Sequence, residues 1–302
     1  MTSTPLPAIE TVGLTKRFGD KLAVDDLNLQ VKPGSTFGFI GPNGAGKTTT
    51  IRMMMNTLRR TNGEVRVLGM DVAADPEAMK QRVGYVPELH RIHGWMRVHE
   101  VVGFCRGVYR HWNDLRCREL LRIFELEPHR KVKHLSKGMV VKLALTLAIS
   151  HDPEVLILDE PTSGLDPIIR EEFLDGVLQQ VCERNATVLF SSHTLADVQR
   201  LADSIGIIYE GRLLACCPTD ELLTGTKRLR AVLRDGGVPG APPDGTIWQR
   251  VNHREWLLTV RGFTPATVEC LRREQPIDHV EVIDLSLEEI FKDMVKGRRA
   301  AS

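Results

Sequence analysis

The stretch GPNGAGKTT, Gly41 to Thr49, follows the apolar run Thr36–Ile40 and precedes a segment of helical character, 51–60. Strand, glycine loop and helix, in that order, are the context in which G-x-x-x-x-G-K-[ST] binds phosphate. The glycines let the backbone turn its N–H groups inward at dihedral angles that a Cβ would oppose. We therefore expect a nucleotide-phosphate site here rather than an ordinary glycine turn before a buried helix.

Two side chains of this stretch have specific expected roles. Lys47 supplies a point charge for the outer phosphates, and the Thr48 hydroxyl can bind Mg²⁺. The helix that follows presents its N-terminus to the same anion. The residues expected around the phosphates are Gly41, Pro42, Asn43, Gly44, Ala45, Gly46, Lys47, Thr48 and Thr49.

The length and the charge distribution bound the number of domains and the kind of partner. A chain of 302 residues suggests two domains. The net charge is only +1, but the segment from Arg91 to Lys142 carries twelve Lys or Arg against five acids, so it is +7 and the remainder is −6. A basic stretch suits an anionic partner, either a lipid headgroup surface or a nucleic acid, and is equally compatible with a solvated face.

We expect an intracellular, soluble protein. No apolar run approaches the ~18–20 residues that a membrane span needs. The opening MTSTPLPAIE lacks the charged and apolar regions of a signal peptide. The six cysteines show no C-x-x-C spacing, so we expect reduced thiols.

Strands alternate with helices along most of the chain. Such alternation predicts an α/β fold with ligands at the carboxyl ends of the strands. Amphipathic helices are expected between Met96 and Leu126, one capped by Asp114, and an apolar helix capped by Ser136. The expected strands are 9–14, 27–31, 36–40, 64–69, 81–88, 155–158 and 186–192.

The pattern changes near Gly225. The loop GGVPGAPPDG, 236–245, lies among short strands and helices with no recognisable chemical motif. This predicts a small α+β tail. Its expected strands are 228–233, 248–251, 256–260 and 279–283, and its expected helices are 265–273 and 286–295.

Three further residues bear on the chemistry. Asp159 ends a buried strand and Glu160 follows it. In phosphate-loop enzymes the first carboxylate holds Mg²⁺ and the second can orient the attacking water. Phe18 is either a core residue or a ring that stacks on a purine.

The motifs occur in the order phosphate loop, LSKGM (135–139), LILDEPTSGLD (156–166) and a strand ending SSH (191–193). This order resembles the ATP-binding cassette (ABC) ATPases, over about residues 9–223. The resemblance implies a P-loop NTPase core, α/β, with a mixed, largely parallel sheet and antiparallel strands at the N-terminus. The implied domains are 1–225, with a helical subdomain inserted at about 89–150, and a small α+β extension at 226–302.

The resemblance also assigns residues. Glu160 would be the general base, assisted by Lys47 and by His193 as the switch histidine that senses the γ-phosphate. Phe18 would stack on adenine, and Glu88 stands where the glutamine loop begins. The implied metal ligands are Thr48, Glu88 and Asp159. The residues expected to face the ATP of a second subunit are Leu135, Ser136, Lys137, Gly138 and Met139, and Asp166 belongs to the loop that joins the two sites.

Two positions depart from the common family pattern. Position 88 is Glu where most of the family has Gln, and the signature reads LSKGM rather than LSGGQ. Both variants, and DLSLEEIF at 284–291, resemble bacterial exporter ATPases whose permease is a separate chain.

We therefore expect an ATP-binding and ATP-hydrolysing transporter subunit that uses ATP and Mg²⁺. Its expected partners are a second ATPase subunit, identical or related, and an integral-membrane permease at the cytoplasmic face of the plasma (inner) membrane.

Two alternatives remain at this point. A nucleic-acid-associated ABC ATPase would carry coiled coils or zinc modules, whereas 88 residues separate Lys47 from Ser136 without sustained heptads or C-x-x-C pairs. We therefore expect no nucleic-acid partner. An ATP-gated regulator with weak hydrolysis is conceivable from Glu88 and Lys137.

The histidines at 90, 93, 99 and 111 could suggest a metal site. They lack an acid or Cys at known metal-ligand spacing, so we do not expect one there.

Overall fold

A computed structural model describes residues 6–88 and 92–301, with the side chains of 178–184 and 301 left out. The chain divides into two compact units. The first is Met1–Thr194 with Ile208–Leu213, and the second is Leu195–Ile207 with Leu214–Ser302. The predicted boundary at residue 225 and the subdomain at 89–150 stay predictions. His90, Arg91 and the Cys182 side chain lie outside the described part.

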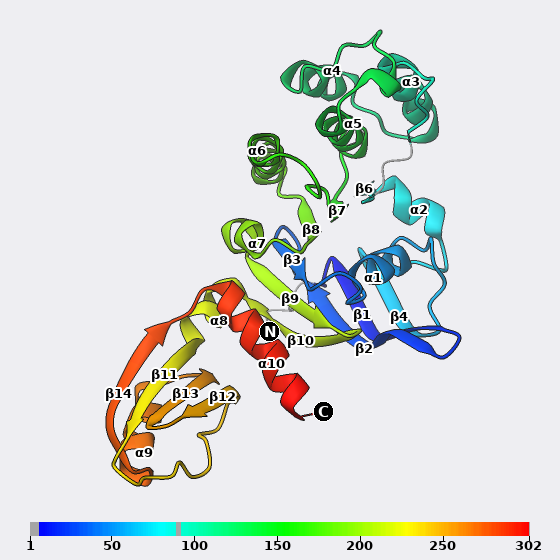
Figure 1. The fold of residues 1–302 in the computed structure, drawn as a ribbon. Helices are drawn as coiled ribbons and strands as arrows, with labels where there is room; N and C mark the ends of the chain where they lie inside the picture. The colour runs from blue at the N-terminus through cyan, green and yellow to red at the C-terminus, as the bar shows by residue number, and fades with distance from the viewer. Residues whose placement is uncertain (1–5, 89–91, 302) are drawn as a thin grey trace, which may run out of the picture. The chain divides into compact units, whose positions relative to one another are not determined.

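The first unit contains an antiparallel sheet near the N-terminus (Figure 1). Its first two strands form a hairpin in which Phe18 pairs with Lys21 across a turn at Gly19, whose φ is 55°. The hairpin extends both predicted strands. The strand order is β2 (Lys21–Val31), β1 (Ile9–Phe18), β4 (Asn62–Val67), β5 (Met70–Asp71).

A six-stranded sheet carries the phosphate loop. The pairs β3–β8, β8–β7 and β7–β6 are parallel, which confirms the predicted largely parallel core, and the N-terminal antiparallel strands form a sheet of their own. The carboxyl ends of β3, β7 and β8 therefore meet at one edge. The order is β10 (Arg212–Pro218), β9 (Ser204–Tyr209), β3 (Thr36–Ile40), β8 (Thr187–Ser192), β7 (Val155–Asp159), β6 (Val83–Val86).

The helices of the first unit correct two expectations. Asn113 rather than Asp114 caps α4, because its side chain accepts from the Arg116 N–H at 3.0 Å and Asp114 is already helical. The helix after the phosphate loop ends at Met54, since Asn56 adopts a left-handed φ of 49°. The helices are α1 (Lys47–Met54), α2 (Pro76–Gln81), α3 (Val98–Val108), α4 (Asp114–Ile123), the 3₁₀ turn η1 (Val132–His134), α5 (Lys137–Ile149) and α6 (Pro167–Arg184).

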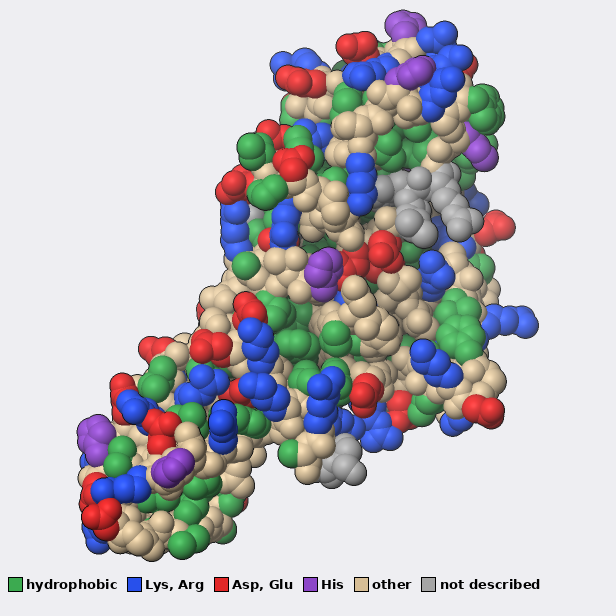
Figure 2. Space-filling model, viewed as in Figure 1, with side chains coloured by type: hydrophobic (Ala, Val, Ile, Leu, Met, Phe, Trp, Pro, Cys, Tyr) green, Lys and Arg blue, Asp and Glu red, His purple; other side chains and the backbone are tan. Residues whose placement is uncertain are grey.

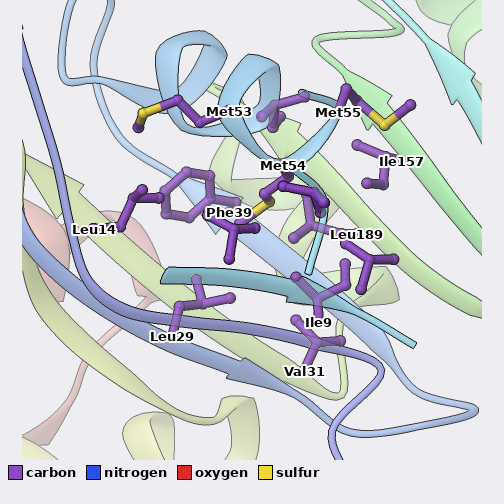
Figure 3. Close-up of a cluster of buried hydrophobic side chains, with 14 of the residues drawn as sticks. Ile9, Leu14, Leu29, Val31, Phe39, Met53, Met54, Met55, Ile157 and Leu189 are labelled. Carbon is purple, nitrogen blue, oxygen red and sulfur yellow. The ribbon is translucent and has the colours of Figure 1, made fainter. Parts of the chain in front are cut away.

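The core of the first unit fixes α1 on the sheets. Met53 and Met54 lie beside Phe39 of β3, with side chains of β1 and β2 below them (Figure 3). Phe39 and Met54 are fully buried. Burial of such side chains contributes about 1.5–3 kcal/mol each, so the loop between β3 and α1 is held firmly at both ends.

The basic segment covers the part of the first unit around α3 and α4, where Figure 2 shows Lys, Arg and His side chains gathered. Part of this charge is neutralised within the chain, because Arg106 pairs with Asp114 and Arg116 pairs with Asp152. No described helix is both long and apolar enough to cross a bilayer.

The second unit contains an antiparallel sheet flanked by helices. The predicted tail elements form with longer ends, and α10 runs past Val295 to Ala301. The strand order is β12 (Thr246–Asn252), β13 (Glu255–Arg261), β11 (Thr226–Leu233), β14 (Ile277–Asp284). The helices are α7 (Leu195–Leu201), α8 (Thr219–Gly225), α9 (Pro265–Glu274) and α10 (Leu287–Ala301).

A buried ion pair fastens α10 to this sheet. Asp293 Oδ2 lies 2.6 Å from Arg228 Nη2 and accepts the Thr259 hydroxyl at 2.6 Å. At Gly297 the helix lies so close to β12 that an added Cβ would sit 1.8 Å from the Ile247 carbonyl oxygen. Glycine is therefore required there.

Candidate functional site

The phosphate loop is held in shape by close backbone contacts at two glycines. A Cβ on Gly41 would lie 2.3 Å from the Ile208 carbonyl oxygen. Gly46 has a φ of 114°, and a Cβ there would lie 2.7 Å from the Ala23 carbonyl oxygen. Any side chain at these positions would displace the loop, whose N–H groups glycine leaves able to turn toward an anion.

Lys47 is the cation of the site and is almost fully buried. Its ammonium donates to the carbonyl oxygens of Gly41 at 2.6 Å and Pro42 at 3.3 Å, and lies 3.0 Å from Glu160 Oε1. The sequence predicts that Lys47 faces phosphates and that Glu160 faces water. The structure shows, in addition, that the two side chains pair with each other.

Asp159 has the properties of a cation ligand. Its Oδ1 accepts the hydroxyls of Thr48 at 3.1 Å and Ser191 at 2.9 Å, while its buried Oδ2 has no hydrogen-bond partner among the described residues. Burial raises the pKa of Asp159, these two hydrogen bonds oppose that rise, and the nearby Glu88 and Glu160 carboxylates add to it. An unpartnered buried oxygen beside a threonine hydroxyl fits an oxygen-seeking divalent ion.

Glu160 occupies an unusual backbone conformation. Its φ is 47°, in the left-handed region that residues with a Cβ seldom adopt, and its N–H donates to Ser191 Oγ at 2.9 Å. Its Oε2 lies 2.7 Å from His193 Nδ1 and accepts the His193 backbone N–H at 3.3 Å. The half-exposed His193 therefore extends the Lys47–Glu160 pair toward solvent.

Ser191 was not predicted as a site residue. It touches both Asp159 and Glu160 because β7 and β8 are parallel and Asp159 stands opposite Ser191 in the register. The signal was present in the SSH stretch, whose two serines end a buried strand beside the carboxylates. Only the strand pairing reveals that the first of the two serines contacts them.

The loop and the Glu160 carboxylate line one cavity of about 350 Å³, whereas Asp159 lines a neighbouring cavity together with Glu88. Phe18, which is 47% exposed, lies on the wall of the first cavity with its ring 4.8 Å from the Lys16 ammonium. Glu88 also lines the first cavity. The first cavity is lined by eight of the ten residues expected around this chain's own nucleotide, which are Phe18, Pro42, Asn43, Gly44, Gly46, Lys47, Thr48 and Thr49. Gly41 and Ala45 do not line it, and the predicted base Glu160 does.

The signature residues form a separate group. Ser136 caps α5 by accepting the Met139 N–H at 3.2 Å, as predicted, but it is exposed and does not line the phosphate-loop cavity. The Lys137 ammonium lies over Gly164, where an added Cβ would be 2.4 Å from it. Asp166 caps α6 through the Ile169 N–H at 3.1 Å. The structure thus brings the phosphate loop, Asp159 and Glu160 together within one chain and leaves the signature residues outside the phosphate-loop cavity.

Two of the histidines considered above as metal ligands contact other groups of the protein. His99 Nδ1 lies 2.8 Å from the Pro128 carbonyl oxygen, and its ring meets that of His129 edge-on. His93 stacks on Trp95. Within residues 6–88 and 92–301 no three His, Cys, Asp or Glu side chains are grouped as a metal site.

Known proteins match this arrangement. The family model described as ABC transporter matches residues 24–163. The bacitracin transport ATP-binding protein BcrA of Bacillus licheniformis is 38% identical over 216 residues, which cover 71% of each chain. The chain belongs to the ABC transporter ATP-binding proteins. It is an ATP-binding ABC ATPase subunit, as the motif order predicted.

Further relatives extend the comparison of this ABC ATPase. The daunorubicin resistance ATP-binding protein DrrA3 of Streptomyces coeruleorubidus is 38% identical over 241 residues, 78% of this chain and 76% of that protein. The solved ATP-binding subunit of an ABC transporter aligns with TM-score 0.66 at 29% identity, over 71% of this chain and 91% of that one. A dimeric ATP-binding cassette in a post-hydrolysis state with ADP and Pi aligns with TM-score 0.63 at 21% identity, over 70% and 98%, which shows the fold alone.

Proposed function

We propose that this ABC ATPase works as one half of a closed pair of cassettes that sandwiches two MgATP and drives a separate membrane permease in export. One observation carries the proposal: Lys47 and Glu160 line one cavity and Asp159 bonds to Thr48 beside it, while Ser136 is exposed and does not line that cavity. A site whose second anion-binding group faces away is complete only when another copy supplies that group.

The Lys47–Glu160 pair gives the site its resting state. When triphosphate enters, Lys47 exchanges the Glu160 carboxylate for phosphate oxygens, which removes the Lys47 charge from Glu160. Glu160 keeps His193 at 2.7 Å and becomes able to accept a proton from water. A positioned general base of this kind contributes about 10²–10⁴-fold in rate.

Thr48 and Asp159 would hold Mg²⁺, with Glu88 close enough to act on the same ion. The ion supplies charge neutralisation on the outer phosphate oxygens. Within the chain, Ser191 and Thr48 hold Asp159 Oδ1 by hydrogen bonds, and the unpartnered Oδ2 would be left for the cation. A carboxylate at position 88 would strengthen metal binding and weaken phosphate binding relative to Gln.

Ser136 and the N-terminus of α5 would bind the outer phosphate held by the partner copy. The helix dipole contributes about 0.3–1 kcal/mol and each hydrogen bond to a charged oxygen about 1.5–3 kcal/mol. Loss of that phosphate removes these contacts, and the pair opens. Lys137 adds a second positive charge beside the signature serine.

The names of the relatives support export. Among the matched proteins are a bacitracin transport protein, a daunorubicin resistance protein and the Nod factor export ATP-binding protein I of Burkholderia lata, 37% identical over 216 residues. We place this chain at the cytoplasmic face of the membrane beside its permease. The basic surface around α3 and α4 suits that position.

Mixing two inactive variants tests the shared site. Lys47→Ala disables the phosphate loop and Ser136→Ala disables the signature, so each variant alone should hydrolyse little ATP. In an isologous pair, the mixture contains one intact composite site in each heterodimer, and about a quarter of the wild-type rate should return. The measurement is phosphate release from MgATP against the ratio of the two chains.

A mixture of Lys47→Ala with the double variant Lys47→Ala/Ser136→Ala is the matched control, because it contains no intact phosphate loop. Recovery of activity only in the first mixture supports the pair. Equal rates in the two mixtures would reject it. Export is tested separately, by recovering the chain from native membranes and identifying the integral protein that accompanies it.

A further inference from the structure

The second unit contains a cavity of its own, about 380 Å³ in volume. Its walls come from the end of β10, from α8, and from the ends of β12 and β13 that lie together in the sheet. It has no role in the proposed ATPase chemistry. Its lining side chains indicate a ligand.

Arg261 is the cation of this cavity. The guanidinium is half-buried, and within the described part of the chain it makes no ion pair; its side-chain partner is Cys217 Sγ at 3.7 Å. The arginines on the neighbouring strand β11 differ, because Arg228 pairs with Asp293 and Arg230 with Glu255. A partly desolvated guanidinium that forms no ion pair has donors available for a carboxylate.

Thr226 is the neighbour of Arg261 on β11 and lies outside the cavity lining. It is fully buried, and its hydroxyl has no hydrogen-bond partner among the described residues. It stands opposite Arg261 in the β11–β13 register, so the two side chains leave the sheet on the same face. The Thr226 hydroxyl therefore adds an unsatisfied polar group to the sheet beside Arg261, but it does not line the cavity and does not contact a ligand there.

The remaining walls define the rest of the ligand. Leu222 and Ile247 contribute apolar surface, and a Cβ on Gly225 or Gly262 would meet nothing within 4 Å, so the space beside them is open. Glu221 also lines the cavity and repels a second negative charge. One cation, one anion at the wall and an apolar floor favour a ligand with a single carboxylate and a hydrocarbon body.

We propose that this cavity binds a small organic monocarboxylate, with its carboxylate on the Arg261 guanidinium and its apolar body against Leu222 and Ile247. The volume accommodates an acid of several carbon atoms. The site lies wholly in the second unit, so its occupation is independent of the phosphate loop and of the proposed pairing of cassettes.

Thiol protection tests the site with octanoate as the probe. Cys217 lines the cavity, whereas Cys216 is exposed and its side chain leaves β10 in the opposite direction. Alkylation by N-ethylmaleimide of the peptide that contains residues 216 and 217 is followed by mass spectrometry, in Cys216→Ser to report on Cys217 and in Cys217→Ser to report on Cys216. Octanoate should slow the first reaction severalfold and leave the second unchanged, and octan-1-ol and suberate should protect far less.

Variants of the full chain then locate the carboxylate. Arg261→Met should weaken octanoate binding by about 10–100-fold, as loss of a charged hydrogen-bond partner implies, with Arg261→Lys retaining part of it. Arg250→Met, at an exposed arginine of β12 outside the lining, should change nothing, and Gly225→Leu should block binding by filling the space. Equal protection of Cys216, no protection of Cys217, or unchanged affinity in Arg261→Met would overturn the proposal.

Discussion

Each unit of this ABC ATPase contains a buried ion pair. Lys47 meets Glu160 at 3.0 Å in the first unit, and Arg228 meets Asp293 at 2.6 Å in the second. Both carboxylates are nearly removed from water, with exposed side-chain fractions of 8% and 2%. The two pairs are chemically alike, but their surroundings differ.

Glu160 lines a cavity of about 350 Å³, and its other oxygen bonds to the half-exposed His193. Asp293 lies on α10 and its Oδ2 is shared between Arg228 and the fully buried Thr259. Lys47 retains two backbone carbonyl partners if Glu160 is lost. If Asp293 is lost, the Thr259 hydroxyl loses its acceptor and Arg228 keeps only the longer contact with Glu289 at 3.5 Å. The Lys47–Glu160 pair, which lies beside a cavity, is therefore suited to exchanging partners. The Arg228–Asp293 pair lies between a helix and a sheet and is suited to holding these two elements together.

The largest effect is expected from Glu160→Gln. Phosphate release should fall by about 10²–10⁴-fold because the base is lost. ATP binding should persist, since Lys47 no longer needs to leave a carboxylate. Turnover is measured by phosphate release and binding by a fluorescent ATP analogue, and undiminished turnover would remove Glu160 from its proposed role.

Asp293→Ala should lower the stability of the protein and leave nucleotide binding intact. Breaking a buried pair costs about 3–5 kcal/mol, so the free energy of unfolding of the second unit should drop by that order while nucleotide binding is kept. Glu281→Ala is the control, because its contact with Arg230 at 3.5 Å is exposed and should contribute less than about 1 kcal/mol. Urea titrations followed by circular dichroism distinguish the two. A similar loss of unfolding free energy in Asp293→Ala and Glu281→Ala would show that the buried Arg228–Asp293 pair contributes no more than an exposed one.

His151 provides a buried ionisable group in the first unit that lies outside the catalytic cluster. It is 3% exposed and stacks on Tyr109 with ring centroids 3.9 Å apart, near the Arg116–Asp152 pair. Burial lowers its pKa to about 4, partly offset by backbone groups of Val83 and Leu147. Because the unfolded chain takes up this proton first, near the ordinary pKa of 6.5, stability should be lost as the pH falls from 6.5 to 4.

His151→Phe keeps the ring stacking and removes the titration. Between pH 6.5 and 4 the wild-type chain should lose up to about 3 kcal/mol more unfolding free energy than the variant. Urea titrations at several pH values give the comparison, and the carboxylates common to both chains cancel in the difference. Parallel pH profiles would show that the His151 ring is not responsible.

The smallest effect is expected at Phe18. Its ring is 47% exposed on the cavity wall, so Phe18→Ala should weaken ATP binding only about 2–10-fold, the range of an aromatic contact. Phe18→Trp should restore binding. Val12→Ala, an equally exposed position on the same strand, is the control. Unchanged affinity in Phe18→Ala would place the adenine elsewhere.

The sequence predicted the elements well because the evidence for them is local. Gly41–Thr49, the apolar strands and the cap at Ser136 each depend on residues close together in the chain, and the structure shows them as expected. Where two neighbouring residues were equally good caps, the local pattern could not choose, and Asn113 caps α4 instead of Asp114. The roles assigned to individual site residues stay predictions until the variants are measured.

Contacts between distant residues could not be predicted. Lys47 and Glu160 pair because β3 and β7 lie on either side of β8 in the sheet, and no local pattern encodes that neighbourhood. The same holds for Arg228 and Asp293, which are brought together by the packing of α10 on its sheet. Ser191 joined the site for a similar reason, through its register with Asp159.

The chain passes from the first unit to the second directly after His193 and Thr194. The first unit reaches Thr194 and the second resumes at Leu195, so a single residue separates His193 from that crossing. Both the ring and the backbone N–H of His193 are bonded to Glu160 Oε2. Bond geometry allows one residue to absorb little displacement. The hydrogen bonds to Glu160 therefore hold the main chain two residues before the second unit begins.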